Sequence, residues 1–417
     1  MKTISIISLG CFRNSYDSEI ILNNFINNGY VLKEKANKLD ILIINTCGFI
    51  KEAKKESLET IERAIRLKKD GKVKRLIVMG CLVQRYYKEL TGIFSNVDEW
   101  MGVEKLNHAS IRRCFLYPPH ITFIKVCEGC INNCSYCAIP IIKGPLVSRR
   151  IGSIIEEAKL LDRRGVKELN IIGQDVTSWG KDLYKDKDIT YLLKNIIKNT
   201  KNIRWIRLLY THPKNFTNSL IDIIAEEDRL CKYVDLPIQH INDRILKMMN
   251  RMITKKEIIE LIKKIRKKIK KVVIRTTIIV GFPTETEEEF KELLDFIKDI
   301  RFERLGVFMY SREERTSAYK LKPLVPDKIK RDRYKEVMSL QQKISEEFNR
   351  SLIGRNLEVL IDSQRNNTFI GRSQYSAYEI DGVVFIRDGN CRLGNFYEVK
   401  IVDASHYDLV GIIDEIN

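Results

Sequence analysis

Three cysteines stand close together in the segment EGCINNCSYC, at positions 130, 134 and 137. Their spacing, Cys130-x-x-x-Cys134-x-x-Cys137, suits three irons of a [4Fe–4S] cluster and leaves the fourth iron without a protein ligand. An iron of this kind can bind a substrate, whereas a cluster held by four cysteines serves electron transfer. The spacing therefore predicts a cluster that takes part in the chemistry itself.

Cys127 leaves two alternatives open. With Cys130 it forms one pair and Cys134 with Cys137 forms a second, so a zinc site or a four-cysteine cluster is imaginable. Zinc ribbons separate their two pairs by roughly 12–20 residues, and here three residues intervene. Cys127 also stands where we expect a strand to be still extended. We favour the three-cysteine cluster.

A second set of cysteines depends on the expected strands. Cys11, Cys47 and Cys81 each follow a short apolar run, in the contexts SLGC, NTCG and MGC. The carboxyl ends of parallel strands meet at one edge of the sheet, where doubly wound folds place their ligands. Three thiolates there could hold a second cluster, although a lone free cysteine is more often a small buried residue. Because three share the same setting, we favour the cluster.

Apolar runs and helical patterns alternate through the first hundred residues. The runs TISIISLG, DILIINT and RLIVMG are typical of buried parallel strands, and a helical pattern spans residues 49–67. We therefore expect a doubly wound α/β domain at residues 1–115. The periodicity lapses between His108 and Pro119, where this domain should end.

Alternation resumes on a larger scale and predicts an incomplete, TIM-like (β/α) barrel at residues 116–349. The cysteines at 130–137 follow its first strand, at the end where such barrels build active sites. The candidate strands are ITFIKVC, ELNIIGQD, WIRLLY, YVDLPIQ, VVIRTTIIVGFP and RLGVFMYS.

The last segment, residues 350–417, has short strands separated by Gly and Asn, which predicts a small all-β barrel. From residue 351 onward it carries six Lys and Arg against ten Asp and Glu, while the whole chain of 417 residues has a net charge of +18. Much of the positive charge comes from lysines that are frequent throughout the chain. Residues 255–271 predict an amphipathic helix with isoleucines on one face and lysines on the other.

No apolar run reaches the roughly 18–20 residues of a membrane span. The apolar stretch at the N-terminus is too short for a signal peptide and has no small-residue cleavage site. We expect a cytoplasmic protein without a membrane partner. Ten cysteines in a chain of this length are too few for a disulfide scaffold and fit metal binding better.

These motifs together resemble the radical S-adenosylmethionine methylthiotransferases along essentially the whole chain. Within them the chain looks most like the group that modifies an aspartate of ribosomal protein uS12. Phe12 departs from the usual proline, and Cys127 from a small non-cysteine residue. The matching stretches are SLGCFRNSYDSE, INTCGFIKEAKKES, MGCLVQRY, EGCINNCSYCAIPIIKGPLVSR, GQDVTSWG, YVDLPIQH, RTTIIVGFPTETEEEF and GRSQYSAYEIDGVVFIR.

The resemblance implies a TRAM domain at the C-terminus and two [4Fe–4S] clusters. An auxiliary cluster would be held by Cys11, Cys47 and Cys81, and the radical cluster by the cysteines at 130, 134 and 137. The implied reaction adds a methylthio group to the β-carbon of the aspartate. The radical is generated at the cluster, so no side chain is expected to act as a catalytic residue.

The resemblance also implies contacts to S-adenosylmethionine. Tyr136 matches the aromatic residue that lies against the adenine, and Gly173, Gln174, Asp175 and Gly281 fall in stretches that contact this cofactor. The implied partners are uS12, free or in an assembling small subunit, and an electron donor such as flavodoxin or ferredoxin. The sulfur donor is not indicated, and we expect a monomer.

Two other functions compete with this one. A tRNA methylthiotransferase of the MiaB type would share fold and chemistry, but a tRNA-binding C-terminal barrel should be basic, whereas an acidic one suits a basic ribosomal protein. A non-catalytic nucleic-acid-binding module with structural zinc would explain the charge and the paired cysteines. It would not explain six βα repeats or the strand-end cysteines.

Overall fold

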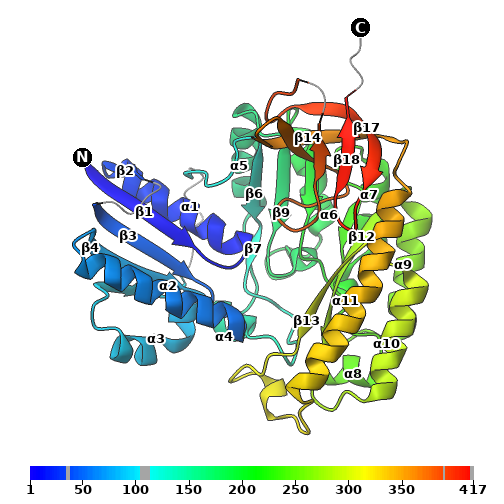
Figure 1. Cartoon of the computed structure of the whole chain (residues 1–417), viewed down its shortest axis with the longest axis horizontal. Coiled ribbons are helices and arrows are strands. Elements are labelled where there is room, and N and C mark those ends of the chain that lie inside the picture. Colours follow the sequence, from blue (N-terminus) through cyan, green and yellow to red (C-terminus); the bar gives the residue numbers. More distant parts are fainter. Residues whose placement is uncertain (34–37, 104–112, 388–389, 414–417) are drawn as a thin grey trace.

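The computed structural model describes residues 1–33, 38–103, 113–387 and 390–413. An N-terminal α/β layer lies to one side of a central parallel barrel, and a small β-barrel lies across one end of the central barrel (Figure 1). The division at residues 115 and 349 stays a prediction, and His108 lies outside the described residues. No helix in the described ranges is long and apolar enough to cross a membrane.

The N-terminal sheet has five parallel strands in the order β2-β1-β3-β4-β5. Ile21 and Leu22 of α1 pack on one face of the sheet, whereas Ile61 of α2 and Leu90 of α3 pack on the other. The doubly wound arrangement expected from the sequence is therefore confirmed. The elements are β1 (Lys2–Ser8), α1 (Phe12–Asn27), β2 (Tyr30–Leu32), β3 (Leu39–Thr46), α2 (Lys51–Lys69), β4 (Val73–Gly80), α3 (Cys81–Ile93) and β5 (Glu99–Met101).

The central barrel contains the six expected strands, but they form two sheets of three parallel strands. The first has the order β10-β9-β6 and the second β11-β12-β13. An isolated bridge links Ile206 of β10 to Leu230, which lies three residues before β11. β11 has three residues, because Pro237 follows shortly and has no N–H for a ladder. The strands are β6 (Ile121–Lys125), β9 (Glu168–Ile172), β10 (Trp205–Leu208), β11 (Tyr233–Asp235), β12 (Val273–Val280) and β13 (Arg304–Met309).

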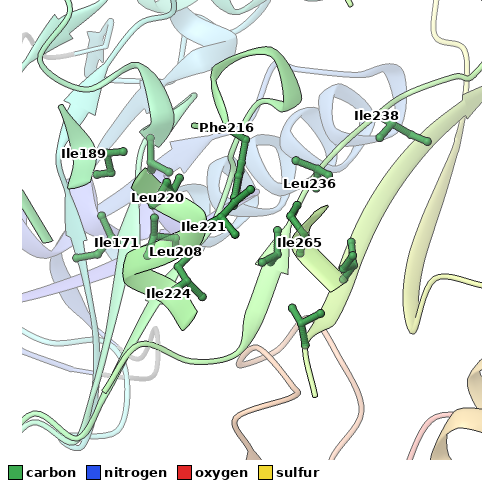
Figure 2. Packing of buried hydrophobic residues seen from close by; sticks show 14 of the residues in the cluster. Ile171, Ile189, Leu208, Phe216, Leu220, Ile221, Ile224, Leu236, Ile238 and Ile265 are labelled. Atoms are coloured by element: carbon green, nitrogen blue, oxygen red, sulfur yellow. The ribbon is translucent and has the colours of Figure 1, made fainter. Parts of the chain in front are cut away.

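Helices cover the outside of the central barrel and bury one apolar face each. Strand residues Ile171 and Leu208 pack with Leu220, Ile221 and Ile224 of α7, as Figure 2 shows. The remaining elements of this part are β7 (Cys127–Glu128), α4 (Ile139–Lys143), β8 (Val147–Ser148), α5 (Ile151–Arg163), η1 (Val176–Ser178), α6 (Ile189–Asn199), η2 (Pro213–Asn215), α7 (Asn218–Glu226), α8 (Asp243–Met248), α9 (Lys255–Lys268), α10 (Glu287–Ile300), η3 (Ser317–Lys320) and α11 (Asp327–Arg350).

The amphipathic helix expected at 255–271 is α9. A capping box between Thr254 and Glu257 begins it, and its buried residues are Ile258, Ile262 and Ile265. Its lysines lie on the outer face, which accounts for part of the positive charge of the chain.

The C-terminal barrel is closed, with the strand order β14-β15-β16-β18-β17. It packs on the amino ends of the central strands, where Arg372 of β15 binds Glu168 of β9 at 2.7 Å. Glu168 also binds Arg207 of β10 at 2.9 Å, so a buried carboxylate joins the two barrels. The strands are β14 (Asn356–Arg365), β15 (Thr368–Ser373), β16 (Val384–Ile386), β17 (Phe396–Ala404) and β18 (Leu409–Ile412).

Candidate active site

A cavity of about 290 Å³ opens at the carboxyl ends of the central strands, between the barrel and the N-terminal layer. Cys130, Cys134 and Cys137 line it from the loop after β7. Arg13 and Phe49 line it from the N-terminal layer. Both parts of the molecule therefore form the wall of one site.

The loop that carries the three cysteines is shaped by a glycine and by hydrogen bonds to sulfur. Gly129 has φ +65°, and a Cβ there would meet Pro145 O at 2.0 Å. The backbone N–H of Asn132 donates to Cys130 Sγ at 3.4 Å, and that of Ile139 donates to Cys137 Sγ at 3.5 Å. Such donors stabilise a thiolate that binds iron.

Two further observations concern the charge at these cysteines. Burial raises the pKa of Cys137 to about 12, so its thiolate form needs a metal or another positive charge nearby. The charge of Arg13 acts to lower the pKa of Cys137, and Arg251 lies at the neighbouring cysteine, where its Nη1 donates to Cys134 Sγ at 3.5 Å. This donor set fits an iron–sulfur cluster.

The N-terminal cysteines lie at the ends of three adjacent strands. Cys11 precedes α1, Cys47 follows β3, and Cys81 begins α3 directly after β4. Gly10, with φ +91°, lies so close to Cys47 that a Cβ would meet its Sγ at 2.9 Å. Cys81 Sγ lies 3.7 Å from Asn14 Oδ1 of α1. The edge of the sheet therefore gathers the three thiols around the start of α1.

The pKa values of these thiols differ with their surroundings. Burial raises the pKa of Cys81 to about 12. Burial also acts to raise the pKa of Cys11, but the charge and hydrogen bond of Arg13 outweigh it and lower that pKa.

Cys127 is placed differently from the other cysteines of its segment. It is 1% exposed, and its Sγ lies 3.7 Å from Asp175 O. A Cβ on Gly173 would meet this sulfur at 2.6 Å. Cys127 is therefore packed beneath the end of β9 and does not line the cavity with Cys130, which weighs against the four-cysteine alternatives.

Within the described ranges, no three His, Cys, Asp or Glu side chains are arranged to hold a single metal ion. A four-iron cluster requires wider ligand spacing, because each thiolate binds a different iron.

The residues expected to contact S-adenosylmethionine divide into two groups. Tyr136, Gln174 and Asp175 line the cavity, whereas Gly173 and Gly281 are not among its described lining residues. Gly173 faces Cys127, as described above. Gly281 has φ +70°, and a Cβ there would meet Lys330 Cγ at 2.4 Å. The role of these two glycines toward the cofactor stays a prediction.

The cavity wall also holds polar atoms that the sequence analysis did not single out. His212 Nε2, Gln239 Oε1, Arg251 Nε and Tyr310 OH are buried and have no hydrogen-bond partner among the described residues. Burial lowers the pKa of His212 to about 3, so its ring is neutral at pH 7. Buried polar groups without partners are rare in folded proteins, so this wall fits a polar ligand.

Gln239 lies within YVDLPIQH, one of the stretches that resemble the methylthiotransferases, so the sequence did hold a signal for this residue. Arg251 lies in none of the motifs or spacings of the sequence analysis, so the sequence held no signal for it.

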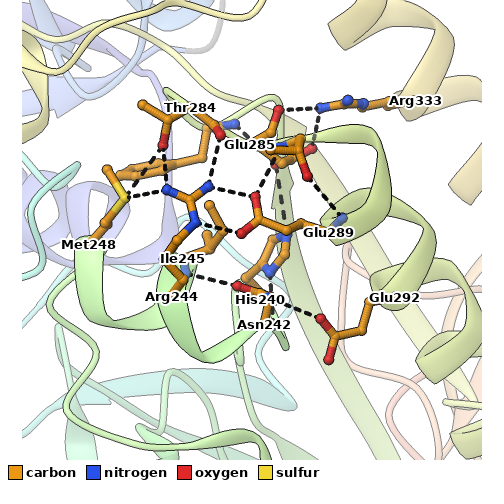
Figure 3. A network of polar contacts seen from close by, with 12 residues as sticks. His240, Asn242, Arg244, Ile245, Met248, Thr284, Glu285, Glu289, Glu292 and Arg333 are labelled. Carbon is orange, nitrogen blue, oxygen red and sulfur yellow. Dashed lines mark hydrogen bonds and ion pairs between the residues drawn. The ribbon is translucent and has the colours of Figure 1, made fainter.

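A polar network fixes the loop that follows β12, as Figure 3 shows. Arg244 of α8 donates to Thr284 O at 2.8 Å and pairs with Glu289 at 2.6 Å. Arg333 of α11 pairs with Glu285 at 2.7 Å. The loop follows Ile279 at the end of β12, and Ile279 lines the cavity, so this network holds the end of a strand that forms one of its walls.

Four buried charges connect the two sets of cysteines. Asp17 of α1 pairs with Lys125 at the end of β6, and Lys125 pairs with Glu128 at 2.5 Å. Lys143, at the end of α4, lies 3.3 Å from Asp17 and 3.4 Å from Glu128. Burial alone would raise the pKa of Glu128. The charges of Lys125 and Lys143 outweigh this effect, and the pKa is lowered to about 2. We call these four residues the charge ring.

Three family models match the chain. The Radical SAM superfamily matches residues 124–297, the TRAM domain matches residues 353–413, and a family described as uncharacterized, UPF0004, matches residues 3–102. The radical SAM match supports an iron–sulfur cluster and S-adenosylmethionine as cofactors.

A solved structure gives independent support for the fold. The radical S-adenosylmethionine methyltransferase TsrM from Kitasatospora setae superposes with a TM-score of 0.53 at 13% identity, over 76% of this chain and 77% of that chain.

Curated relatives match over almost the full length. The ribosomal protein uS12 methylthiotransferase RimO of Caldanaerobacter subterraneus subsp. tengcongensis is 46% identical, over 99% of this chain and 100% of that protein. RimO of Thermoanaerobacter sp. is 44% identical over 99% and 100%, and RimO of Clostridioides difficile is 42% identical over 99% and 98%. The cavity with its cysteines, the three domain matches and these relatives agree, and the chain belongs to the RimO family of radical S-adenosylmethionine methylthiotransferases.

Proposed function

We propose that this enzyme adds a methylthio group to the β-carbon of an aspartate in ribosomal protein uS12, using two [4Fe–4S] clusters and S-adenosylmethionine. The observation that carries the proposal is the wall of the cavity. Cys130, Cys134 and Cys137 line it directly, and Arg13, which lines it too, donates from its Nε to Cys11 Sγ at 3.3 Å. One cysteine set therefore lines the cavity, and Arg13 connects the cavity to Cys11 of the other set.

Six cysteines would hold the two clusters, and their donor chemistry fits that task. Cys130, Cys134 and Cys137 would bind the radical cluster, and the N-terminal cysteines would bind the auxiliary cluster. S-adenosylmethionine would lie along Tyr136 and Gln174. When bound, these groups supply one-electron chemistry that can functionalise a carbon with no acidic proton, which side-chain acids and bases cannot do.

The chain itself positions these groups and keeps water from them. Asp175 accepts hydrogen bonds from Asn132 at 2.7 Å, Asn215 at 2.9 Å and Ser178 at 2.6 Å, so the loop of Cys130 is fastened to the end of β9. The apolar part of the cavity wall includes Ile50, Ile139 and Ile279. Excluding water protects a reactive species from side reactions.

The assignment of uS12 as the substrate rests mainly on the family. The acidic charge of the C-terminal barrel supports it less than the sequence suggested. Glu358 of the C-terminal barrel pairs with Arg204 of the central part, and Asp362 pairs with Arg372 at 2.6 Å inside the barrel. Asp381 accepts a hydrogen bond from a tyrosine of β11 at 2.7 Å. Part of the acidic charge is thus neutralised within the molecule and does not face a partner.

The test is mass spectrometry of uS12 and of bulk tRNA from cells with and without the gene. We expect a methylthio group on the uS12 aspartate to disappear with the gene, while methylthiolated tRNA nucleosides persist. Loss from tRNA with an unchanged uS12 would overturn the substrate assignment. In purified reactions the electrons would come from a donor such as flavodoxin or ferredoxin.

A further inference from the structure

Arg13 occupies a distinctive place between the two sets of cysteines. It lies in the first turn of α1, two residues after Cys11, and its side chain lines the cavity. Its Nε donates to Cys11 Sγ at 3.3 Å, and its Nη1 donates to Gly173 O at 3.0 Å. The guanidinium carbon lies 4.3 Å from the centroid of the Tyr210 ring. Contacts from three separate segments therefore fix the plane of this cation.

Among the described residues, the carboxylate of Glu128 acts on Arg13 only from a distance, because it is paired with Lys125 and Lys143. No ion pair found among the described residues includes Arg13, and its Nη2 makes none of the hydrogen bonds found there. A guanidinium has five N–H donors in a fork that matches a carboxylate. Arg13 thus presents unused donors at the wall of a cavity.

The two carboxylates of the cavity wall have other partners. Asp175 is held by the hydrogen bonds described above. Glu313 binds Lys54 and Arg85 of the N-terminal layer, each at 2.8 Å. Neither is free to pair with Arg13, so an anion that enters the cavity would find this cation available.

We propose that Arg13 binds the carboxylate of the substrate aspartate and so fixes its β-carbon between the two cysteine sets. This inference rests on the proposed function, since it names the group that recognises the substrate side chain. The β-carbon is one bond from the carboxylate, so a planar, immobilised guanidinium determines where that carbon lies. Arg13 is thus a specificity-determining residue, and it takes no part in bond making.

The carboxylate of S-adenosylmethionine is the competing anion. The position of a second cation argues for the aspartate. The Nη1 of Arg251 donates to Cys134 Sγ of the radical set at 3.5 Å. Arg13 instead contacts Cys11, on the side from which the proposed auxiliary cluster would deliver sulfur. Arg13 thus makes its hydrogen bond to the N-terminal set and Arg251 to the other set, although the charge of Arg13 also reaches Cys137.

The experiment compares two forms of uS12 on two forms of the anaerobically reconstituted enzyme. One uS12 carries the target aspartate, and the other has asparagine in its place, which keeps the shape but removes the charge. We expect the wild-type enzyme to bind the aspartate form about tenfold or more tightly, the gain typical of a charge-assisted pair. Arg13→Gln should bind both forms equally, at the affinity of the wild type for the asparagine form.

The conservative and control variants sharpen the result. Arg13→Lys keeps the positive charge but loses the planar guanidinium. Its preference for the aspartate form of uS12 should therefore lie between that of the wild-type enzyme and that of Arg13→Gln. Arg63→Gln removes one exposed positive charge on α2, away from the cavity lining, and should keep the full preference.

Several outcomes would overturn the inference, and they differ from failure of the proposed function. Equal binding of both uS12 forms by the wild-type enzyme would do so without any variant, even if Arg13→Gln failed to fold. A weaker affinity for S-adenosylmethionine in Arg13→Gln, with the aspartate preference intact, would assign Arg13 to that cofactor. If the wild-type enzyme bound and modified no uS12 at all, the proposed function itself would fail.

Discussion

Lys143 Nζ lies 3.3 Å from Asp17 Oδ2, and this pair joins the segment after Cys137 to the helix that begins after Cys11. The side chain of Lys143 is 3% exposed and that of Asp17 is 11% exposed. Removing one partner of a buried ion pair leaves an unpaired charge, which lowers the free energy of unfolding far more than it would at the surface. The charge ring therefore holds α1 against the radical part of the molecule and fixes how the two cysteine sets lie relative to each other.

Breaking the charge ring should destabilise the protein strongly. Lys143→Met leaves two buried carboxylates, Asp17 and Glu128, with Lys125 alone, so we expect a loss of about 3–5 kcal/mol. Lys55→Met is the matched control, because its ion pair with Glu59 is exposed at the surface and should contribute about 0–1 kcal/mol. Urea unfolding of both purified variants measures the difference. Similar small losses in the two variants would show that the ring does not join the domains.

The two cysteine sets should separate two steps of the reaction. Cys130→Ala should lose reductive cleavage of S-adenosylmethionine, measured as 5′-deoxyadenosine by chromatography. Cys47→Ala should still cleave it and yet give no methylthiolated uS12. Methylthiolated product from the Cys47→Ala enzyme would rule out an auxiliary cluster at that position.

Cys127 should prove to be a core residue. Cys127→Ala removes a buried sulfur beneath Gly173, so we expect a loss of roughly 1–2 kcal/mol from the small cavity it leaves. Iron content per chain and cleavage of S-adenosylmethionine should match those of the wild-type protein. A drop in iron content comparable to that of Cys130→Ala would instead make Cys127 a ligand.

Buried His240 should make stability fall as the pH decreases. Burial is the largest cause that lowers its pKa, from 6.5 to about 4, against the raising effects of Glu289 and Glu292. Between pH 6.5 and 4 the unfolded chain binds a proton at this residue that the folded chain does not bind. The free energy of unfolding should therefore drop by up to about 3 kcal/mol over this window, with no contribution above it.

The contribution of His240 is isolated by comparing pH slopes. Urea unfolding between pH 7 and 5 should depend less on pH in His240→Asn than in the wild-type protein. Arg63→Gln is the control, because it changes an exposed side chain that keeps its charge throughout this pH range and so should leave the slope unchanged. Parallel slopes for His240→Asn and the wild-type protein would contradict the prediction.

Local patterns in the sequence were sufficient for the architecture. The apolar runs before Cys11, Cys47 and Cys81 predicted buried parallel strands, and the strands are there. The later alternation predicted six strands of an open barrel, and the last segment a small closed one. Such features follow from periodicity and turn residues, which act over a few neighbouring positions. The break between β10 and β11 was not predicted, because strand pairing depends on positions far apart in the chain.

The spacing of the cysteines at 130–137 likewise predicted the chemistry, because the spacing of thiols within a short loop is a local property of the sequence. Tertiary packing alone decided which side chains surround that loop. Arg13 contacts the carbonyl of Gly173, 160 residues away, and Cys127 turns under that same glycine although it lies close to the other cysteines in the sequence. Charges such as Asp17 and Lys125 become a buried pair only when two domains meet. No local sequence pattern predicts contacts between such distant residues, because these contacts depend on the shapes of the packed surfaces.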